Sequence, residues 1–130
     1  MSLNLRRLAD TLAVCKLPAQ DLIPQWALEA AAPSLLSITR TPDELSIVCS
    51  EAQVPSGLAD VERSWGCLKV ESPLDFALTG ILSSLAAPLA DAQISIFAIS
   101  TFDTDYLMVK QDKLDQAIQI LSRNGHLIRS

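Results

Sequence analysis

Aromatic residues, glycine and histidine are scarce in this sequence. Aromatics make up 5% of its 130 residues, and it contains four glycines and a single histidine, His126. With so few aromatics, a hydrophobic core has to be built mainly from Leu, Ile, Val and Ala. The isolated glycines form no Gly-rich phosphate loop, and one histidine without Cys-x-x-Cys or His-x-x-x-His spacing argues against a metal site. We expect neither a metal nor a cofactor.

Few cysteines, no long apolar run and a shortage of positive charge exclude further classes of protein. Cys15, Cys49 and Cys67 are an odd number at wide spacing, which argues against a disulfide framework and for a reducing compartment. We therefore expect a cytoplasmic protein. No apolar run approaches the roughly 20 residues of a membrane-spanning helix. A net charge of −5 disfavours nucleic acid and anionic membranes as partners.

The residues of a catalytic site are also missing. All three cysteines lie in or next to apolar segments, where buried and inert thiols are the rule. Asp103 and Asp105 share one loop and do not face each other across a cleft, which gives little support to general acid–base catalysis. We expect a protein that is not an enzyme.

The C-terminal half alternates between expected strands and helices. A first helix is expected to begin at Ser72-Pro73, with Ser as the cap, and to be ended or distorted at Pro88. Gly80 inside this helix is interpreted as permitting close packing on a sheet, with close approach of a ligand as the alternative. A second helix is expected to be capped by Asp112 and to end at Gly125. Strands are expected at 67–71, 94–99, 106–110 and 126–129. This βαββαβ order predicts a ferredoxin-like α+β sandwich, with two helices on one face of a four-stranded sheet.

The N-terminal half is less regular. A strand is expected at 12–17 and a hairpin at 35–39 and 45–49, and residues 58–63 are expected to form one or two helical turns. A shift of about 61 residues lays Glu44 over Asp105, so that strand, polar loop and strand recur. Many β-hairpins would match equally well, so a duplication and a chance match both stay open on this pattern.

The segment 94–109, ISIFAISTFDTDYLMV, resembles a signature of one subfamily of ACT domains. This subfamily includes small bacterial tandem-ACT proteins and a cytosolic arginine sensor of animals. Three further segments also fit: 65–70, the 80–82 helix and the 87–90 turn. The hairpin between 35 and 48 fits as well. The Ser-Thr-Phe-Asp-Thr-Asp-Tyr string is the most specific part of the resemblance.

The resemblance implies two ACT modules in tandem. The first, residues 1–62, is a degenerate module shortened where prolines interrupt its helix. The second is residues 63–130. It also implies a regulatory protein that binds a small molecule, an amino acid, between ACT modules. Leu78 stands where the sensor has an acidic ligand contact, so specificity for arginine is not implied.

The resemblance also implies a set of ligand-binding residues. Carried over position by position, these are Ser95, Ile96, Thr101, Phe102 and Asp105. The carboxylate of Asp105 could accept a charge-assisted hydrogen bond from an ammonium or guanidinium group. The alternative is that Asp103 and Asp105 only stabilise the turn by bonding to nearby backbone.

Two further expectations concern association. A mean hydropathy of +0.29 exceeds what two small modules easily bury, so we expect a homo-oligomer, most simply a homodimer. An alternative function is a degenerate ACT pair that acts only as a protein–protein interaction or oligomerisation module.

Overall fold

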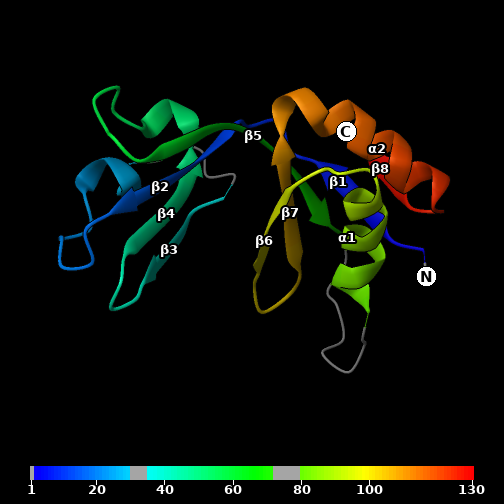
Figure 1. Ribbon diagram of the computed structural model, residues 1–130, viewed down its shortest axis with the longest axis horizontal. Helices are drawn as coiled ribbons and strands as arrows, with labels where there is room; N and C mark the ends of the chain where they lie inside the picture. Colours follow the sequence, from blue (N-terminus) through cyan, green and yellow to red (C-terminus); the bar gives the residue numbers. More distant parts are fainter. Residues whose placement is uncertain (1, 30–34, 72–79) are drawn as a thin grey trace. The chain divides into compact units, whose positions relative to one another are not determined.

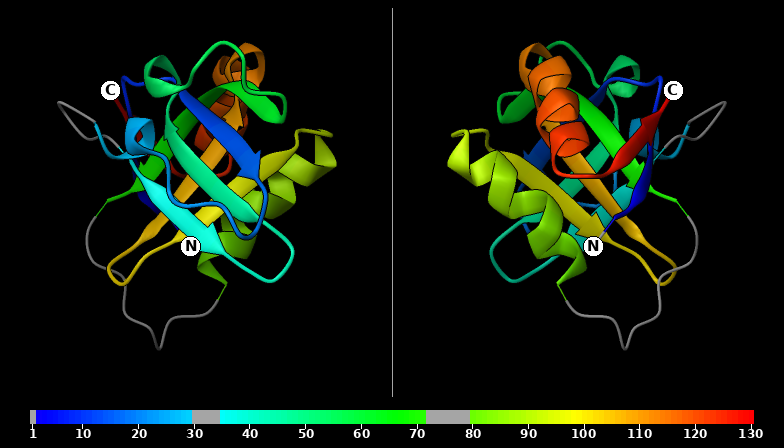
Figure 2. Two further views of the ribbon diagram at one scale, coloured as in Figure 1. Left: turned by 90° about the vertical axis from the view of Figure 1, so that its left-hand side faces the viewer. Right: turned by 90° about the vertical axis from the view of Figure 1, so that its right-hand side faces the viewer.

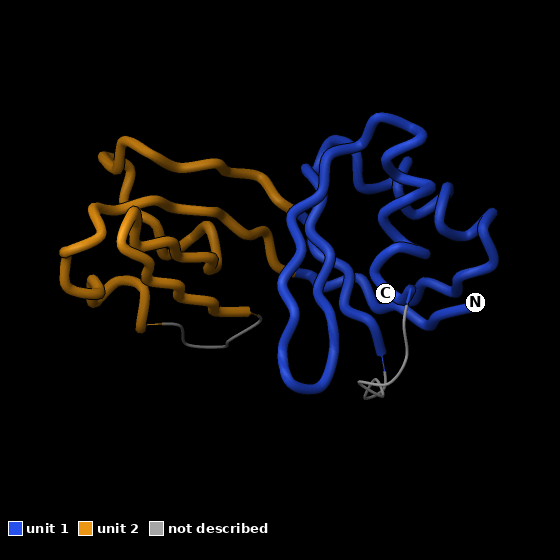
Figure 3. Tube along the Cα trace, turned by 60° about the horizontal axis from the view of Figure 1, so that its bottom comes forward, with its two compact units in different colours: residues 1–9, 66–130 blue, residues 10–65 orange. Residues whose placement is uncertain are grey.

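The computed structural model describes residues 2–29, 35–71 and 80–130, which form two compact units (Figures 1 and 3). The N-terminal unit is Asp10–Trp65. The C-terminal unit combines Gly66–Ser130 with the first nine residues of the chain. The boundary between these two units thus falls inside one continuous strand, β5 (Val61–Val70).

The N-terminal unit is a four-stranded antiparallel sheet in the order β3-β4-β2-β5. Its strands are β2 (Leu12–Leu17), β3 (Ser37–Arg40), β4 (Leu45–Ser50) and the first half of β5. This is the strand order of a ferredoxin-like module. Among the described residues, short 3-10 helices at Gln25–Leu28 and Glu51–Gln53 occupy the connections where α-helices are expected.

Alternation along β2 separates the two faces of this sheet. Ala13 and Cys15 point into an apolar cluster with Ile47 and Cys49, whereas Val14 and Lys16 project from the opposite face. The strand prediction for 12–17 is confirmed. The helical turns expected at 58–63 are wrong, because from Val61 onward these residues pair with β2 as a strand.

The C-terminal unit has the βαββαβ order predicted from Gly66 onward. Its elements after β5 are α1 (Ile81–Asp91), β6 (Ile96–Ser100), β7 (Asp105–Lys110), a 3-10 helix (Gln111–Lys113), α2 (Leu114–Arg123) and β8 (Leu127–Arg129). The α+β class and the ferredoxin-like fold are confirmed. In the described part of this unit, the sheet has one more strand than the four expected, because β1 (Asn4–Arg7) lies between β5 and β8. Leu5 pairs with Val70 on one side and with Ile128 on the other.

Helices α1 and α2, which Figure 2 draws as ribbons, bury their apolar faces in one cluster with the sheet. Leu85 and Leu89 of α1 and Leu114 and Leu121 of α2 are almost fully buried there. They contact the face of the sheet that carries Leu5, Leu68, Val70, Leu107 and Val109. In the described residues, no helix is long and apolar enough to cross a membrane.

The helix ends agree with the sequence in part. Gly125, with φ +92°, is the C′ residue of α2, and the bonds from Gly125 N to Ser122 O and from His126 N to Leu121 O complete a Schellman motif. This prediction is confirmed. The proposed cap at Asp112 is wrong, because Asp112 lies in the 3-10 helix and α2 begins at Leu114 without a side-chain cap.

The first helix also differs from its prediction. Its expected start at Ser72 lies outside the described residues. Gly80 precedes α1 with φ +78°, and a Cβ placed there would meet nothing within 4 Å. Close packing therefore does not explain this glycine, and its left-handed backbone does. Pro88 does not end the helix, which continues to Asp91.

Candidate functional site

The turn between β6 and β7 is a small, internally bonded structure. The backbone N–H of Thr101 donates to the carbonyl of Thr104 at 2.8 Å. The Thr101 hydroxyl donates to the same carbonyl at 3.1 Å and accepts from the Thr104 N–H at 3.3 Å. The buried Thr104 hydroxyl donates to the carbonyl of Val70 at 2.7 Å. This last bond ties the turn to the end of β5.

The residues carried over by resemblance fall into two groups. Thr101, Phe102 and Asp105 lie together at the turn, whereas Ser95 and Ile96 lie at the opposite end of β6. An extended strand rises about 3.3 Å per residue, which puts Ile96 about 17 Å from Thr101. The structure therefore brings three of the five residues together and leaves two apart.

The side chains at the turn differ in exposure and bonding. Phe102 is 82% exposed. Asp105 is half-buried and accepts a hydrogen bond of 2.6 Å from the hydroxyl of Ser100, the residue opposite it in the hairpin. Thr101 uses its hydroxyl within the turn. These bonds agree with a structural role for the turn, and they also hold Asp105 in one orientation.

A second hairpin in the N-terminal unit repeats this geometry. The Thr41 N–H donates to the Glu44 carbonyl at 2.9 Å, and the Thr41 hydroxyl accepts from the Glu44 N–H at 3.2 Å. The closing pairs are Arg40 with Leu45 and Ser100 with Asp105, sixty positions apart. Glu44 therefore corresponds to Thr104, and not to Asp105 as the shift read from the sequence implied. Leu45 is the counterpart of Asp105.

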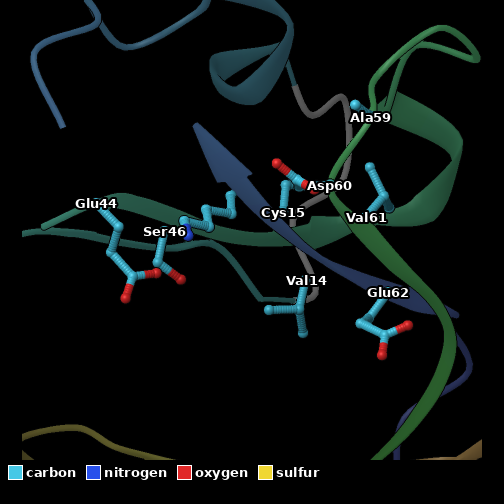
Figure 4. A pocket seen from close by; sticks show the side chains of 9 residues that line it. Val14, Cys15, Glu44, Ser46, Ala59, Asp60, Val61 and Glu62 are labelled. Carbon is cyan, nitrogen blue, oxygen red and sulfur yellow. The ribbon is translucent and has the colours of Figure 1, made fainter. Parts of the chain in front are cut away.

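The N-terminal unit also contains a pocket of about 320 Å³ that the sequence reasoning did not find (Figure 4). Its lining comes from β2, from the start of β4 and from the residues around the start of β5. The residues are Val14, Cys15, Lys16, Glu44, Ser46, Ala59, Asp60, Val61 and Glu62. Of its four charged residues, only Lys16 was on an expected strand, so the sequence offered little signal for this pocket. Only the pairing of the strands, with Lys16 opposite Ser46 and its N–H bonded to the Asp60 carbonyl, brings these charges together.

The three cysteines are buried and free. A hydrogen bond from the Cys49 thiol lowers the pKa of Cys15, and the same bond together with burial raises the pKa of Cys49. Burial raises the pKa of Cys67 to about 12. Across the described ranges there is no group of three or more His, Cys, Asp or Glu side chains that could hold a metal ion.

Comparison with known proteins identifies the family. A model of the ACT domain matches residues 60–123, and a model of an N-terminal domain matches residues 10–57. The chain is 37% identical to protein Atu0741 from Agrobacterium tumefaciens. Their structures align with a TM-score of 0.90 over 98% of this chain and 92% of that chain. The chain belongs to the ACT-domain family.

Other ACT-related proteins show how far the similarity extends. The bovine cytosolic arginine sensor for mTORC1 subunit 1 is 32% identical over 103 residues. That alignment covers 72% of this chain but only 31% of the sensor. The regulatory subunit of aspartate kinase from Thermus thermophilus aligns with a TM-score of 0.60 over 95% of both chains. At 12% identity, this second similarity concerns the fold alone.

Proposed function

We propose that this ACT-domain protein is a non-enzymatic regulatory protein that binds a small ligand, an amino acid, and acts in the cytoplasm. Three findings support the proposal: membership of the ACT family, similarity to a protein named as an arginine sensor, and a fold like that of an aspartate kinase regulatory subunit. The buried, free cysteines agree with a reducing compartment.

The observation that carries the proposal is the bonded turn between β6 and β7. The bond from Thr104 to Val70 fixes the turn, and the bond from Ser100 orients the Asp105 carboxylate. A carboxylate held in this way loses little conformational entropy when it accepts an ammonium or guanidinium group. Thr101 and Phe102 would contact the remainder of the ligand.

The separation of the two groups of residues favours a homodimer. Ser95 and Ile96 lie about 17 Å along β6 from the turn, too far to share one amino acid with Asp105 of the same chain. We propose that a second copy of the chain supplies one of the two groups, so that a complete site needs two chains.

The second candidate function is a pure interaction module that binds no small ligand. The exposed Phe102 favours it, because a large aromatic side chain in solvent is a common anchor for a protein partner. The Ser100–Asp105 bond would then serve only the turn.

Thermal unfolding with each common amino acid at millimolar concentration tests the first candidate. A ligand present at 100 times its dissociation constant adds about 2.7 kcal/mol of stability, which raises the Tm by several degrees in a chain of this size. We expect one selective shift, which Asp105→Asn abolishes and the neighbouring Asp103→Asn preserves. A panel without any shift would contradict ligand binding and leave the interaction module.

A further inference from the structure

We propose that the pocket of the N-terminal unit is a second small-molecule site, and that it takes an organic ammonium ion with a short apolar stem. The pocket lies wholly within Asp10–Trp65. The turn discussed above belongs to the C-terminal unit. The two sites therefore share no residue, and the second goes beyond the proposed function.

The pocket is built on regular backbone. Val14 and Lys16 alternate along β2 with the buried Ala13 and Cys15, so their side chains leave the sheet on the face opposite the apolar cluster. Ser46 is paired with Lys16 across the sheet. Backbone hydrogen bonds in β2, β4 and β5 hold these positions, which makes a ligand site here largely preformed.

The charges of the lining favour a cation. Three carboxylates, from Glu44, Asp60 and Glu62, face one ammonium group, from Lys16. Glu62 already has an interaction of its own. In the part of the chain that the structure describes, Lys16, Glu44 and Asp60 form no ion pair with another residue. Glu44 and Asp60 can therefore accept from a ligand without giving up an internal partner.

The size and shape of the pocket favour a short molecule with an apolar middle. Its volume of about 320 Å³ is at the lower end of the range for small-molecule sites. Figure 4 shows Glu44 and Glu62 at opposite ends of the lining, with Val14, Cys15 and Asp60 between them. Val14 and Ala59 offer apolar surface to a methylene chain. A short alkyl diamine combines the positive charge with such a chain.

A titration followed by NMR tests the proposal on the full-length chain. The probe is 1,4-diaminobutane, and butyrate, which has the same carbon chain and the opposite charge, is the comparison at equal ionic strength. We expect saturable shifts of the Lys16, Ser46 and Asp60 amide signals with the diamine and none with butyrate. The double variant Glu44→Gln, Asp60→Asn should weaken binding about fivefold or more.

Asp112→Asn is the matched control, because Asp112 is an exposed carboxylate outside the pocket. It should leave the affinity unchanged. Shifts that do not saturate, shifts spread over all acidic surfaces, or equal affinity of the double variant would each overturn the proposal. These outcomes are independent of the amino-acid panel, because Asp105→Asn leaves this pocket intact.

Discussion

The Nε2 atom of His126 lies 3.4 Å from the carbonyl oxygen of Ser84 in α1. Ser84 is four residues before Pro88, which has no N–H and cannot donate the helical bond to that carbonyl. The Nδ1 atom of the same imidazole accepts the N–H of Leu3 at 3.1 Å, so the proton of a neutral ring is on Nε2. His126 is therefore a buried connector between α1 and the strand that begins at Asn4.

His126→Ala should lower the free energy of unfolding by about 1–3 kcal/mol, because it leaves the Leu3 N–H without its acceptor. Chemical denaturation measures this loss. A double-mutant cycle with Pro88→Ala checks the role of the Ser84 carbonyl. Alanine at position 88 has the backbone N–H that proline lacks, so it can donate the helical hydrogen bond to this carbonyl. We expect Pro88→Ala to stabilise the His126→Ala protein more than it stabilises the wild type. Strictly additive effects would show that His126 does not compensate for Pro88.

Thr104→Val should destabilise the C-terminal unit by about 1–3 kcal/mol, because the isosteric change removes the buried hydroxyl that donates to Val70 and leaves its carbonyl unsatisfied. If the turn holds the ligand, amino-acid binding should weaken as well. The exposed Thr39→Val in β3 is the control and should change stability little. Equal stability of the Thr104 and Thr39 variants would contradict an anchoring role for Thr104.

Gly66→Ala should destabilise the protein by about 1–3 kcal/mol through overpacking. A Cβ on Gly66 would lie 2.6 Å from Cδ2 of Leu114 and 2.9 Å from Oε1 of Gln111. Leu114 is buried in the core of the C-terminal unit and has little room to move. Gly57→Ala is the matched control, since a Cβ there meets nothing within 4 Å. A midpoint of urea unfolding that is the same in both variants would show that β5 tolerates a side chain here.

Cys67 should make stability fall with rising pH in the alkaline range. Burial raises its pKa from 9.0 to about 12. Between these values the unfolded chain releases the thiol proton and the folded chain keeps it, so the free energy of unfolding decreases as pH rises. The stability contributed by this group is fully present below pH 9. Urea unfolding between pH 8 and pH 10.5 should show a steeper decline in the wild type than in Cys67→Val, and parallel declines would contradict the prediction.

Local patterns predicted much of the fold. The 12–17 strand, both hairpins and the glycine that ends α2 follow from alternation and turn chemistry, which operate over a few residues. The sequence analysis did not predict the N-terminal strand β1, because this strand depends on distant segments and not on a local pattern. Four residues are too short for a periodicity, and Leu5 is extended because Val70 and Ile128, far away in the sequence, pair with it on both sides.

The two candidate sites also differ in how far apart their residues lie in the sequence. The turn residues Thr101, Phe102 and Asp105 are close in sequence, so a motif could point to them together. The pocket residues Lys16, Glu44 and Asp60 come from three separate segments, and no motif joins them. Strand pairing alone placed the repeat correctly, since it matches Glu44 with Thr104 and not with Asp105.

The sequence by itself determined the α+β class, the ACT family and the second hairpin, because these depend on short-range periodicity and on a contiguous motif. Only the tertiary structure decided that β5 serves both units, that β1 enters the sheet, and that His126 lies beside the carbonyl of Ser84, four residues before Pro88. Each of these depends on backbone groups that find their partners in a distant segment. The requirement to satisfy buried hydrogen-bonding groups acts through space, and local sequence does not reveal it.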